Sequence, residues 1–318
     1  MHKRIAIVGA TGAVGKELIS LLIKRGFSLN QLNCFSSDEK TIVTREGELL
    51  TSALQSESFQ GIDLAFFCVS ATLSKEFIPY ARKSGATVID LSSAFRLHES
   101  VPLVIPEINL FSIEEKRTIA SPNCIVSILL TALFPLHLQA KIKRITAATY
   151  QAASGGGKSL MDRLLLETKT YFEGKQSPFP YAFNLFPHES PLLESNYVEE
   201  EVKIIQECRK ILGESIEVAV TCIRVPVFRA HSIAVFVEFE NAINAKSAAL
   251  LLQKANALTY TEDPSMLNPE YVSQKEKVYC GKIKDDLFRK NTLHLWIVGD
   301  QLLKGAALNA LQIAENFL

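Results

Sequence analysis

One cysteine of this sequence stands where a helix start would make it reactive. Cys124 closes the segment Ser-Pro-Asn-Cys at residues 121–124 and directly precedes the apolar stretch 125–130. A thiol in the first turn of a helix faces backbone N–H groups without helical partners and the positive end of the helix dipole, which favour the thiolate. Cys124 is therefore a candidate nucleophile. The alternative is an inert core residue, because cysteine is among the most often buried residue types.

The remaining cysteines are scattered and show no shared spacing. None forms a Cys-x-x-Cys pair or has the spacing of metal ligands, and the pattern is not that of a disulfide framework. They are Cys34, Cys68, Cys208, Cys222 and Cys280. We therefore expect reduced thiols, no metal site and a cytoplasmic protein.

Further polar residues could complete a site around such a nucleophile. Arg224 offers a planar fork that matches a carboxylate, and His231 could exchange protons near neutral pH, although a lone histidine is more often structural. Asn123 could donate to an oxyanion or could instead cap a helix. Glu200 and Lys203 share one face at the start of a predicted helix, where acidic residues ordinarily interact with the dipole.

Two glycine-rich segments predict close approach of the backbone to a ligand. Gly-Ala-Thr-Gly-Ala-Val-Gly at residues 9–15 lies between an apolar strand and a helical pattern. This context is typical of a loop that binds the pyrophosphate of a dinucleotide at a helix N-terminus. Three glycines at 155–157 follow Gln151 and Ser154 at the end of another predicted strand, where a cofactor or substrate could lie. An unliganded turn and a flexible loop are the respective alternatives.

Composition and periodicity indicate two domains. With 318 residues, 47% of them hydrophobic, and a net charge of zero, the chain can bury large cores and does not suggest a nucleic-acid or membrane-surface partner. The apolar start at 5–8 is too short for a signal peptide, and the stretch 125–138 is too short to cross a bilayer.

The order of predicted elements differs between the two halves of the chain. Strands at 5–8, 64–69 and 87–91 alternate with helices at 14–25 and 73–84, which predicts an α/β domain of Rossmann type with a parallel sheet. After Cys124 the strands at 143–150, 216–225 and 232–239 are longer, and helices are expected at 158–172, 198–212 and 245–258. That part predicts an α+β domain with a mostly antiparallel sheet, followed by a closing helix at 302–317.

The motifs named above, taken in their order along the chain, resemble those of the aspartate-β-semialdehyde dehydrogenase family over nearly the full length. Three more segments are similar to that family: Ser-Ser-Ala-Phe-Arg at 92–96, Pro-Glu-Ile-Asn at 106–109 and Lys-Gly-Ala-Ala-Leu-Asn-Ala at 304–310. The resemblance implies a dinucleotide-binding domain of residues 1–123 and 302–318. It also implies a catalytic and dimerisation domain of residues 124–301, and a homodimer.

The resemblance further implies reductive dephosphorylation of β-aspartyl phosphate, within biosynthesis of lysine, diaminopimelate, threonine and methionine. Cys124 would expel phosphate to form a thioester, which hydride from NADP(H), with NAD(H) possible, converts to the semialdehyde. The other implied roles are acid/base catalysis for His231, orientation of the intermediate for Gln151, α-carboxylate binding for Arg224, α-ammonium binding for Glu200, and phosphate binding for Arg96, Asn123 and Lys203. The implied cofactor contacts are Gly9, Thr11, Gly12, Ala13, Val14, Ser36, Ser37, Ser154, Gly155 and Gln301.

Three positions depart from the family pattern. Asp38 stands where an arginine usually meets the 2′-phosphate of NADP, Ala230 replaces a glycine before the catalytic histidine, and Gln301 replaces an asparagine near the nicotinamide. Two other functions are weighed against this one. N-acetyl-γ-glutamyl-phosphate reductase shares the glycine-rich turn and a catalytic cysteine, and a dinucleotide-binding protein without catalysis would need neither Cys124 nor His231.

Overall fold

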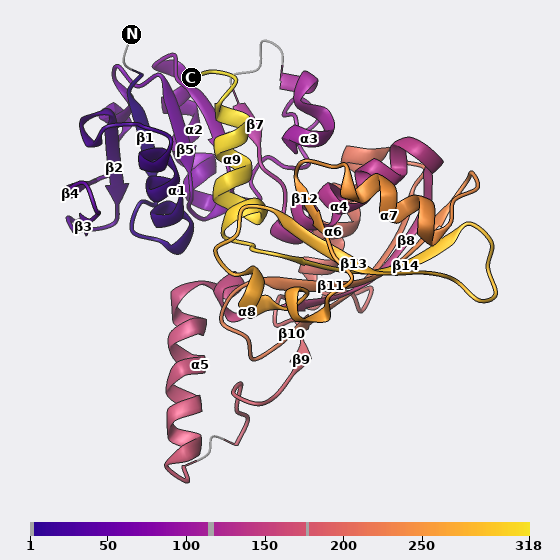
Figure 1. Ribbon diagram of the computed structural model, residues 1–318. Helices are drawn as coiled ribbons and strands as arrows, with labels where there is room; N and C mark the ends of the chain where they lie inside the picture. Colours follow the sequence, from indigo (N-terminus) through magenta and orange to yellow (C-terminus); the bar gives the residue numbers. More distant parts are fainter. Residues whose placement is uncertain (1–2, 114–117, 176–177) are drawn as a thin grey trace. The chain divides into compact units, whose positions relative to one another are not determined.

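The computed structural model describes residues 3–113, 118–175 and 178–318 (Figure 1). The chain divides into two compact units, which we call unit 1 (residues 1–123 and 306–318) and unit 2 (residues 124–305). Residues 302–305, which the sequence places with the closing helix in the first domain, belong to unit 2. Among the described residues, no helix is both long and apolar enough to cross a membrane.

Unit 1 is built on a seven-stranded sheet in the order β3-β4-β2-β1-β5-β6-β7, in which only β3 and β4 pair antiparallel. This arrangement confirms the predicted Rossmann-type domain. Its helices and strands are β1 (Ile5–Val8), α1 (Ala13–Lys24), β2 (Leu32–Ser36), β3 (Thr41–Val43), β4 (Glu48–Ala53), β5 (Leu64–Phe67), α2 (Ala71–Lys83), β6 (Thr87–Asp90), α3 (Pro106–Asn109), β7 (Thr118–Ala120) and α9 (Leu308–Ala314).

Both faces of this sheet are covered, as continuous apolar strands require. Ala6, Val8 and Phe67 pack against Ile78 and Ala81 of α2 on one face. Alternate residues of β1 and β5 point to the opposite face and are equally buried, and α1 and α9 contact each other while α9 contacts β6. The strand order reverses beside β1, so the crevice at the carboxyl ends of β1 and β5 is where such sheets bind ligands.

Unit 2 holds a second seven-stranded sheet in the order β12-β13-β14-β11-β8-β10-β9. It is mostly antiparallel, as predicted, but β8 pairs parallel with β10, and β12 with β13. Its helices and strands are α4 (Cys124–Ala140), β8 (Ile142–Gln151), α5 (Gly157–Phe172), β9 (Phe186–Pro187), α6 (Glu199–Leu212), β10 (Glu217–Arg224), β11 (His231–Phe239), α7 (Ala245–Gln253), β12 (Leu258–Tyr260), α8 (Pro269–Val272), β13 (Val278–Asp285) and β14 (Thr292–Gly299).

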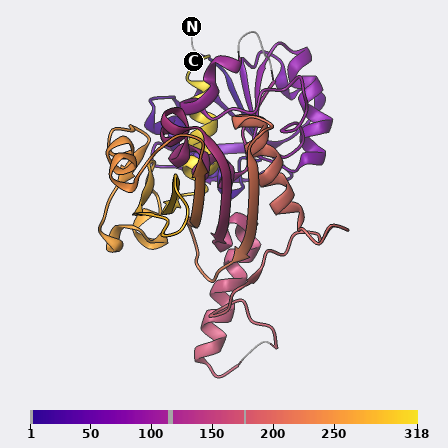
Figure 2. The same cartoon turned by 90° about the vertical axis from the view of Figure 1, so that its right-hand side faces the viewer.

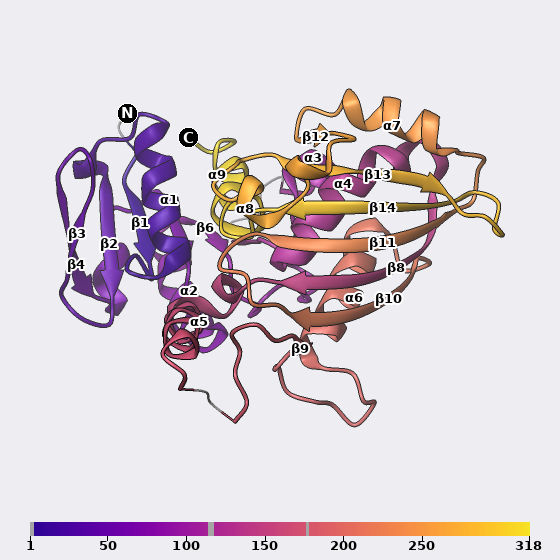
Figure 3. The same cartoon turned by 60° about the horizontal axis from the view of Figure 1, so that its bottom comes forward.

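Helix α4 is the core helix of unit 2. Residues 125–133 are all buried, and α4 contacts β8, β11, β13 and β14 as well as α6 and α7. These three helices cover one face of the sheet (Figure 3). Helix α5 instead extends away from the sheet of its unit, as Figures 1 and 2 both show.

Two predicted helices differ from the observed elements. The helix expected at 245–258 ends at Gln253, because Leu258 already pairs with Val278 in the sheet. The closing segment expected at 302–317 opens with a π-helical turn at Leu303–Ala307 before α9 begins.

Candidate active site

Three of the predicted site side chains, two catalytic and one substrate-binding, meet at one end of the unit 2 sheet. Gln151 and Arg224 are the last residues of the parallel strands β8 and β10 and lie opposite each other in register. His231 is the first residue of β11, which runs antiparallel beside β8 and pairs its first residue with Gly299, the last of β14. Figure 3 shows β8, β10 and β14 ending where β11 begins. All three side chains are buried.

Cys124 is the first residue of α4, where the sequence predicts a helix start. The first turns of α4 lie at the same end of the sheet, because a Cβ added to Gly299 would come within 2.8 Å of Ile128. A Cβ on Gly305 would lie 2.9 Å from the Cβ of Cys124, so glycine is needed there for α4 to begin against this segment. The helix therefore delivers the thiol to the end of the sheet that carries His231.

The other cysteines are unsuited to nucleophilic attack. Burial raises the pKa of Cys34 to about 11 and the pKa values of Cys68, Cys222 and Cys280 to about 12, and it also raises the pKa of Cys208. A thiol held protonated is a poor nucleophile. None of the six cysteines, all of them within the described residues, forms a disulfide.

His231 has one nitrogen engaged and one buried nitrogen without a partner. The backbone N–H of Ala152 donates to Nδ1 over 3.0 Å, so the neutral ring carries its proton on Nε2. Nε2 is buried and has no hydrogen-bond partner among the described residues. Burial, with the charges of Arg224 and His188, lowers the pKa of His231 to about 3. The ring is therefore neutral near pH 7 and presents an unused Nε2–H donor.

The glycine run after Gln151 has a separate physical reason at each position. A Cβ on Gly155 would come within 3.1 Å of His231 Nε2 and 3.3 Å of Arg224 NH1. A Cβ on Gly156 would meet Leu160 at 2.6 Å, and Gly157 has a φ of 80° at the start of α5. The protein's own side chains and the φ of Gly157 therefore account for these glycines, and a cofactor or substrate beside them stays a prediction.

Arg224 is almost fully engaged by neighbouring residues. Its Nε donates to both carboxylate oxygens of Glu189 over 3.1 Å, and NH2 donates to Glu189 Oε1 and to His188 Nε2, each over 2.8 Å. NH1 donates to the carbonyl of Ala152 over 2.9 Å. Sequence reasoning missed His188 and Glu189, because both lie in the irregular segment after β9 and no motif marks them.

The residue before His231 is held in a left-handed conformation. Ala230 has a φ of 70°, in the left-handed region that favours glycine, the residue that the family pattern has at this position. The side-chain oxygen of Gln301 accepts from Ala230 N over 2.9 Å, and its nitrogen donates to Ser154 Oγ. Buried Asp300 accepts from Arg229 Nε over 2.6 Å, so both flanks of Ala230 are tied to the segment that follows β14.

The residues at the start of α6 make hydrogen bonds and ion pairs within unit 2. Glu201 caps the helix and accepts from Cys222 N over 3.0 Å at the neighbouring strand. Lys203 pairs with Glu199 over 2.7 Å. The backbone N–H of Glu200 donates to Ser190 Oγ, which lies 3.1 Å from Nδ1 of His188.

Within unit 1, the turn before Cys124 is held by two polar side chains. Arg96 donates to the carbonyl of Ser121 over 3.0 Å and to the carbonyl of Leu91 over 2.8 Å. Asn309 of α9 donates to Ser121 Oγ over 3.0 Å. Asn123 is buried at the end of this turn, and the chain passes from unit 1 to unit 2 between Asn123 and Cys124.

The glycine loop of unit 1 has the geometry of a dinucleotide cradle. A Cβ on Gly9, whose φ is 86°, would come within 2.3 Å of the Cys68 carbonyl oxygen, and a Cβ on Gly15 would come within 2.3 Å of the Gly9 carbonyl oxygen. Gly12 is instead the N-cap of α1 and provides no side-chain cap. Thr11, Ala13 and Val14 continue this loop into a helix without an acidic residue in its first turn, so the arrangement fits an anionic pyrophosphate.

Ser36 and Ser37 lie at the end of β2 and begin the loop that carries Asp38. Ser36 Oγ donates to Thr51 Oγ1 over 2.8 Å, and Ser37 Oγ donates to Asp38 Oδ2 over 3.2 Å. Lys40 pairs with Asp38 over 3.1 Å, and both side chains are exposed. Hydrogen bonds from Lys40 and Ser37, with the Lys40 charge, lower the pKa of the Asp38 carboxyl.

Comparison with known proteins matches both units to one family. Residues 4–116 match the family model "Semialdehyde dehydrogenase, NAD binding domain", and residues 133–304 match "Semialdehyde dehydrogenase, dimerisation domain". The aspartate-semialdehyde dehydrogenase of Rickettsia conorii is 44% identical over 99% of this chain and 97% of its own length. The chain belongs to the aspartate-semialdehyde dehydrogenase family. It is therefore an oxidoreductase, and the resemblance seen in the sequence is confirmed.

Other aspartate-semialdehyde dehydrogenases agree in sequence and in structure. The Bacillus subtilis protein is 36% identical over 98% of this chain and 96% of its own length. The crystal structure of aspartate semialdehyde dehydrogenase II from Vibrio cholerae superimposes with a TM-score of 0.92 at 33% identity, covering 99% of this chain and 98% of that one. A second structure of the Vibrio cholerae enzyme is complexed with ASA. The family's fold therefore extends over the whole chain.

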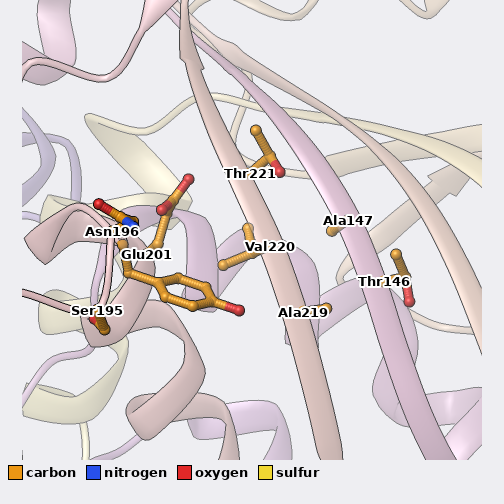
Figure 4. Close-up of a pocket in the computed structure, with 9 residues that line it drawn as sticks. Thr146, Ala147, Ser195, Asn196, Glu201, Ala219, Val220 and Thr221 are labelled. Carbon is orange, nitrogen blue, oxygen red and sulfur yellow. The ribbon is translucent and has the colours of Figure 1, made fainter.

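A hollow elsewhere on the unit 2 sheet does not contain the predicted site residues. It has a volume of about 410 Å³ and lies beside β8, β10 and the start of α6 (Figure 4). Its lining includes Thr146, Asn196, Glu201 and Thr221, and Glu201 is already engaged with the backbone of Cys222. Among the described residues, no group of three or more His, Cys, Asp or Glu side chains could hold a metal ion.

Proposed function

We propose that this member of the family catalyses the NADP-dependent reductive dephosphorylation of β-aspartyl phosphate to aspartate β-semialdehyde. One observation carries the assignment of the chemistry. Cys124 begins a buried helix at the end of the sheet where His231 holds an unused, buried Nε2–H. A thiolate beside a preorganised donor is what formation and breakdown of an acyl-cysteine adduct require.

We assign the covalent step to Cys124. Its sulfur attacks the acyl carbon, the carbon–oxygen bond to phosphate breaks, and phosphate leaves with the bonding electron pair, so that a thioester remains. Each tetrahedral adduct places negative charge on the former carbonyl oxygen. His231 Nε2–H is the donor that we assign to this oxygen, and Gln151 orients the acyl group. Because its Nδ1 already accepts from Ala152, the neutral ring begins as a proton donor rather than as a base.

The remaining polar residues are assigned to the charged groups of the substrate. Arg224 would bind the α-carboxylate and Glu200 the α-ammonium group, while Asn123, Arg96 and Lys203 would bind phosphate. Arg224 is buried at the same end of the sheet as His231, which supports its assignment. Lys203 pairs with Glu199, so its phosphate role requires that this partly exposed ion pair open, which costs little.

The cofactor assignment rests on the glycine cradle of unit 1. Gly9, Gly12 and the first turn of α1 would hold the pyrophosphate, with Ser36 and Ser37 toward the ribose, and Gly155, Ser154 and Gln301 toward the nicotinamide. A bound nicotinamide cofactor supplies the hydride that reduces the thioester. We propose NADP(H) with NAD(H) tolerated, since Lys40 neutralises Asp38 in the loop that would face the 2′-phosphate.

We also propose a cytoplasmic homodimer that serves amino-acid biosynthesis. Exposed apolar side chains on unit 2 support self-association: Phe172 on α5 is 77% exposed, and Phe236 of the sheet is 47% exposed. Substituting Phe236→Glu should shift the mass measured by light scattering from dimer to monomer. The matched substitution Leu50→Glu in unit 1, at a residue 75% exposed, should leave it unchanged. Six cysteines without a disulfide fit a reducing compartment.

One assay with two aldehyde substrates separates the three candidate functions. Purified protein is mixed with aspartate semialdehyde, NADP⁺ and phosphate, and NADPH absorbance is followed, with reactions lacking phosphate as the control. Phosphate-dependent reduction of NADP⁺ is expected. Preference for N-acetylglutamate semialdehyde would favour the reductase alternative, and cofactor binding without turnover of either aldehyde would indicate a non-catalytic protein.

A further inference from the structure

The structure places a carboxylate of the protein itself in the fork of Arg224. Four of the five guanidinium N–H bonds are directed at Glu189, His188 and the Ala152 carbonyl, through Nε, both hydrogens of NH2 and one of NH1. The edge formed by Nε and NH2, which is suited to two parallel bonds with a carboxylate, is filled by Glu189. Any other carboxylate must therefore displace Glu189 to bind that edge.

The two partners differ in how firmly they are held. The Arg224 side chain is 2% exposed, whereas the Glu189 side chain is 46% exposed. Arg224 is fixed in place by its position at the end of β10 and by the Ala152 carbonyl. The only side chain that hydrogen-bonds the Glu189 carboxylate in the described structure is that of Arg224. Moving the Glu189 carboxylate into water therefore costs little free energy, whereas moving the buried Arg224 guanidinium costs much more.

The short segment that carries Glu189 is anchored independently of its carboxylate. Arg224 can only donate, so His188 Nε2 accepts from it. The backbone N–H of Ser190 is directed at His188 Nδ1 over 3.2 Å, and Ser190 Oγ lies 3.1 Å from the same nitrogen. Ser190 Oγ also accepts from the backbone N–H of Glu200 at the start of α6. The backbone on both sides of Glu189 therefore stays in place when its side chain swings out.

We propose that Glu189 is an internal competitor for the substrate carboxylate, which neutralises buried Arg224 in the empty enzyme and sets the affinity of the site for carboxylates. This inference rests on the proposed function only where it names the α-carboxylate of the semialdehyde as the displacing group. A buried guanidinium left without a counter-charge is costly, so the fork is never empty. The binding of substrate is then an exchange of one carboxylate for another.

The exchange predicts a specific kinetic split. In Glu189→Gln the competitor keeps its shape but loses its charge, so KM for aspartate semialdehyde should fall about 3- to 30-fold while kcat stays within about twofold. Glu189→Asp keeps the charge on a shorter side chain, so its KM should lie between those of wild type and Glu189→Gln. The control is Glu194→Gln, which removes the same charge from an exposed position of the same segment and should change neither parameter.

A binding experiment separates this inference from the proposed function. Succinate, a dicarboxylate with no group to react, is titrated into the intact chain by calorimetry, without cofactor. Its affinity should rise about 3- to 30-fold in Glu189→Gln, and Arg224→Lys in the same chain should abolish the gain. Circular dichroism melting checks that each variant is folded.

The outcomes are distinct. An unchanged succinate affinity in folded Glu189→Gln, or a higher KM with kcat reduced tenfold, would overturn the inference, since Glu189 would then position Arg224 rather than compete at it. If Glu189→Gln binds succinate more tightly than wild type, but wild type never oxidises aspartate semialdehyde, the inference stands and the proposed function is wrong.

Discussion

Between pH 5 and pH 8, the charge state of His231 should not limit the rate. The ordinary pKa of histidine is about 6.5, whereas burial beside Arg224 and His188 lowers that of His231 to about 3. At pH 7 the charged ring is then roughly one molecule in 10⁴. Since Nδ1 accepts from Ala152 N, the working form is the neutral ring with its proton on Nε2.

The kinetic test compares wild type with two variants across this range. His231→Ala removes the donor, and kcat should fall by about 10² to 10³, the usual cost of losing one donor to a developing oxyanion. His231→Gln can return an amide N–H near the same position and should recover part of that loss. In wild type, the profile of kcat/KM against pH should show no inflection near pH 6.5 that is lost in His231→Gln. Any inflection in this range should be shared by both enzymes. An inflection that is lost in His231→Gln would refute the donor role and restore His231 as a titrating acid/base.

The same pKa shift predicts the pH dependence of stability. Because the folded-state pKa lies below the unfolded value, the neutral ring contributes stability that is complete above about pH 6.5. That stability is lost as pH falls from about 6.5 toward 3, at about 1.4 kcal/mol for each pH unit. The free energy of unfolding of wild type, measured in urea, should therefore fall more steeply with decreasing pH below pH 6.5. In His231→Gln the same decrease should be shallower. Parallel curves would mean that the ring can charge in the folded state.

Three further substitutions test other parts of the argument. Cys124→Ser should fold normally and lose nearly all turnover, because a hydroxyl lacks the acidity of the thiol; retention of more than a few per cent of kcat would exclude the covalent mechanism. Asp38→Arg should tighten NADPH binding roughly tenfold and leave NADH nearly unchanged in fluorescence titrations; an unchanged ratio would show that Asp38 does not face the ribose. Ala230→Gly should alter the free energy of unfolding in urea by no more than about 1 kcal/mol. Relief of the left-handed conformation contributes about 1 to 2 kcal/mol, and the loss of a buried methyl group and the backbone entropy of glycine offset it. A loss of stability above about 2 kcal/mol would contradict this balance.

The parts of the fold that the sequence predicts are those with strong local signals. The run Ile5–Val8, the glycine loop after it and the helix that begins at Ala13 follow from apolar runs and glycine spacing. The start of α4 at Cys124 follows from the Pro-Asn turn before a long apolar stretch. By contrast, β3 is three residues long and pairs with the adjacent β4, and β9 is two residues long and forms through pairing with the distant β10. Such pairing leaves no local pattern in the sequence.

The same division applies to the candidate site. Gln151, Arg224 and His231 were identifiable because they terminate or begin strands within recognisable motifs. The partners of Arg224 were not, because Glu189 is separated from it by 35 positions and lies in an irregular segment. The tautomer of His231 was also beyond reach, since it depends on the backbone N–H of Ala152, which is 79 positions away. Long-range polar contacts of this kind depend on the folded sheet.

The network around Asp300 explains how a strained alanine persists beside the proposed catalytic histidine. Asp300 is fully buried and accepts from Arg229 Nε, from Gln274 N over 2.6 Å and from Leu302 N over 2.9 Å, so its charge is compensated by donors on three separate segments. Gln301 then fixes Ala230 N directly. A backbone conformation that costs about 1 to 2 kcal/mol survives only where its surroundings determine it from several sides. Because the conformation of Ala230 sets where β11 begins, this network positions the His231 ring and aims its Nε2–H.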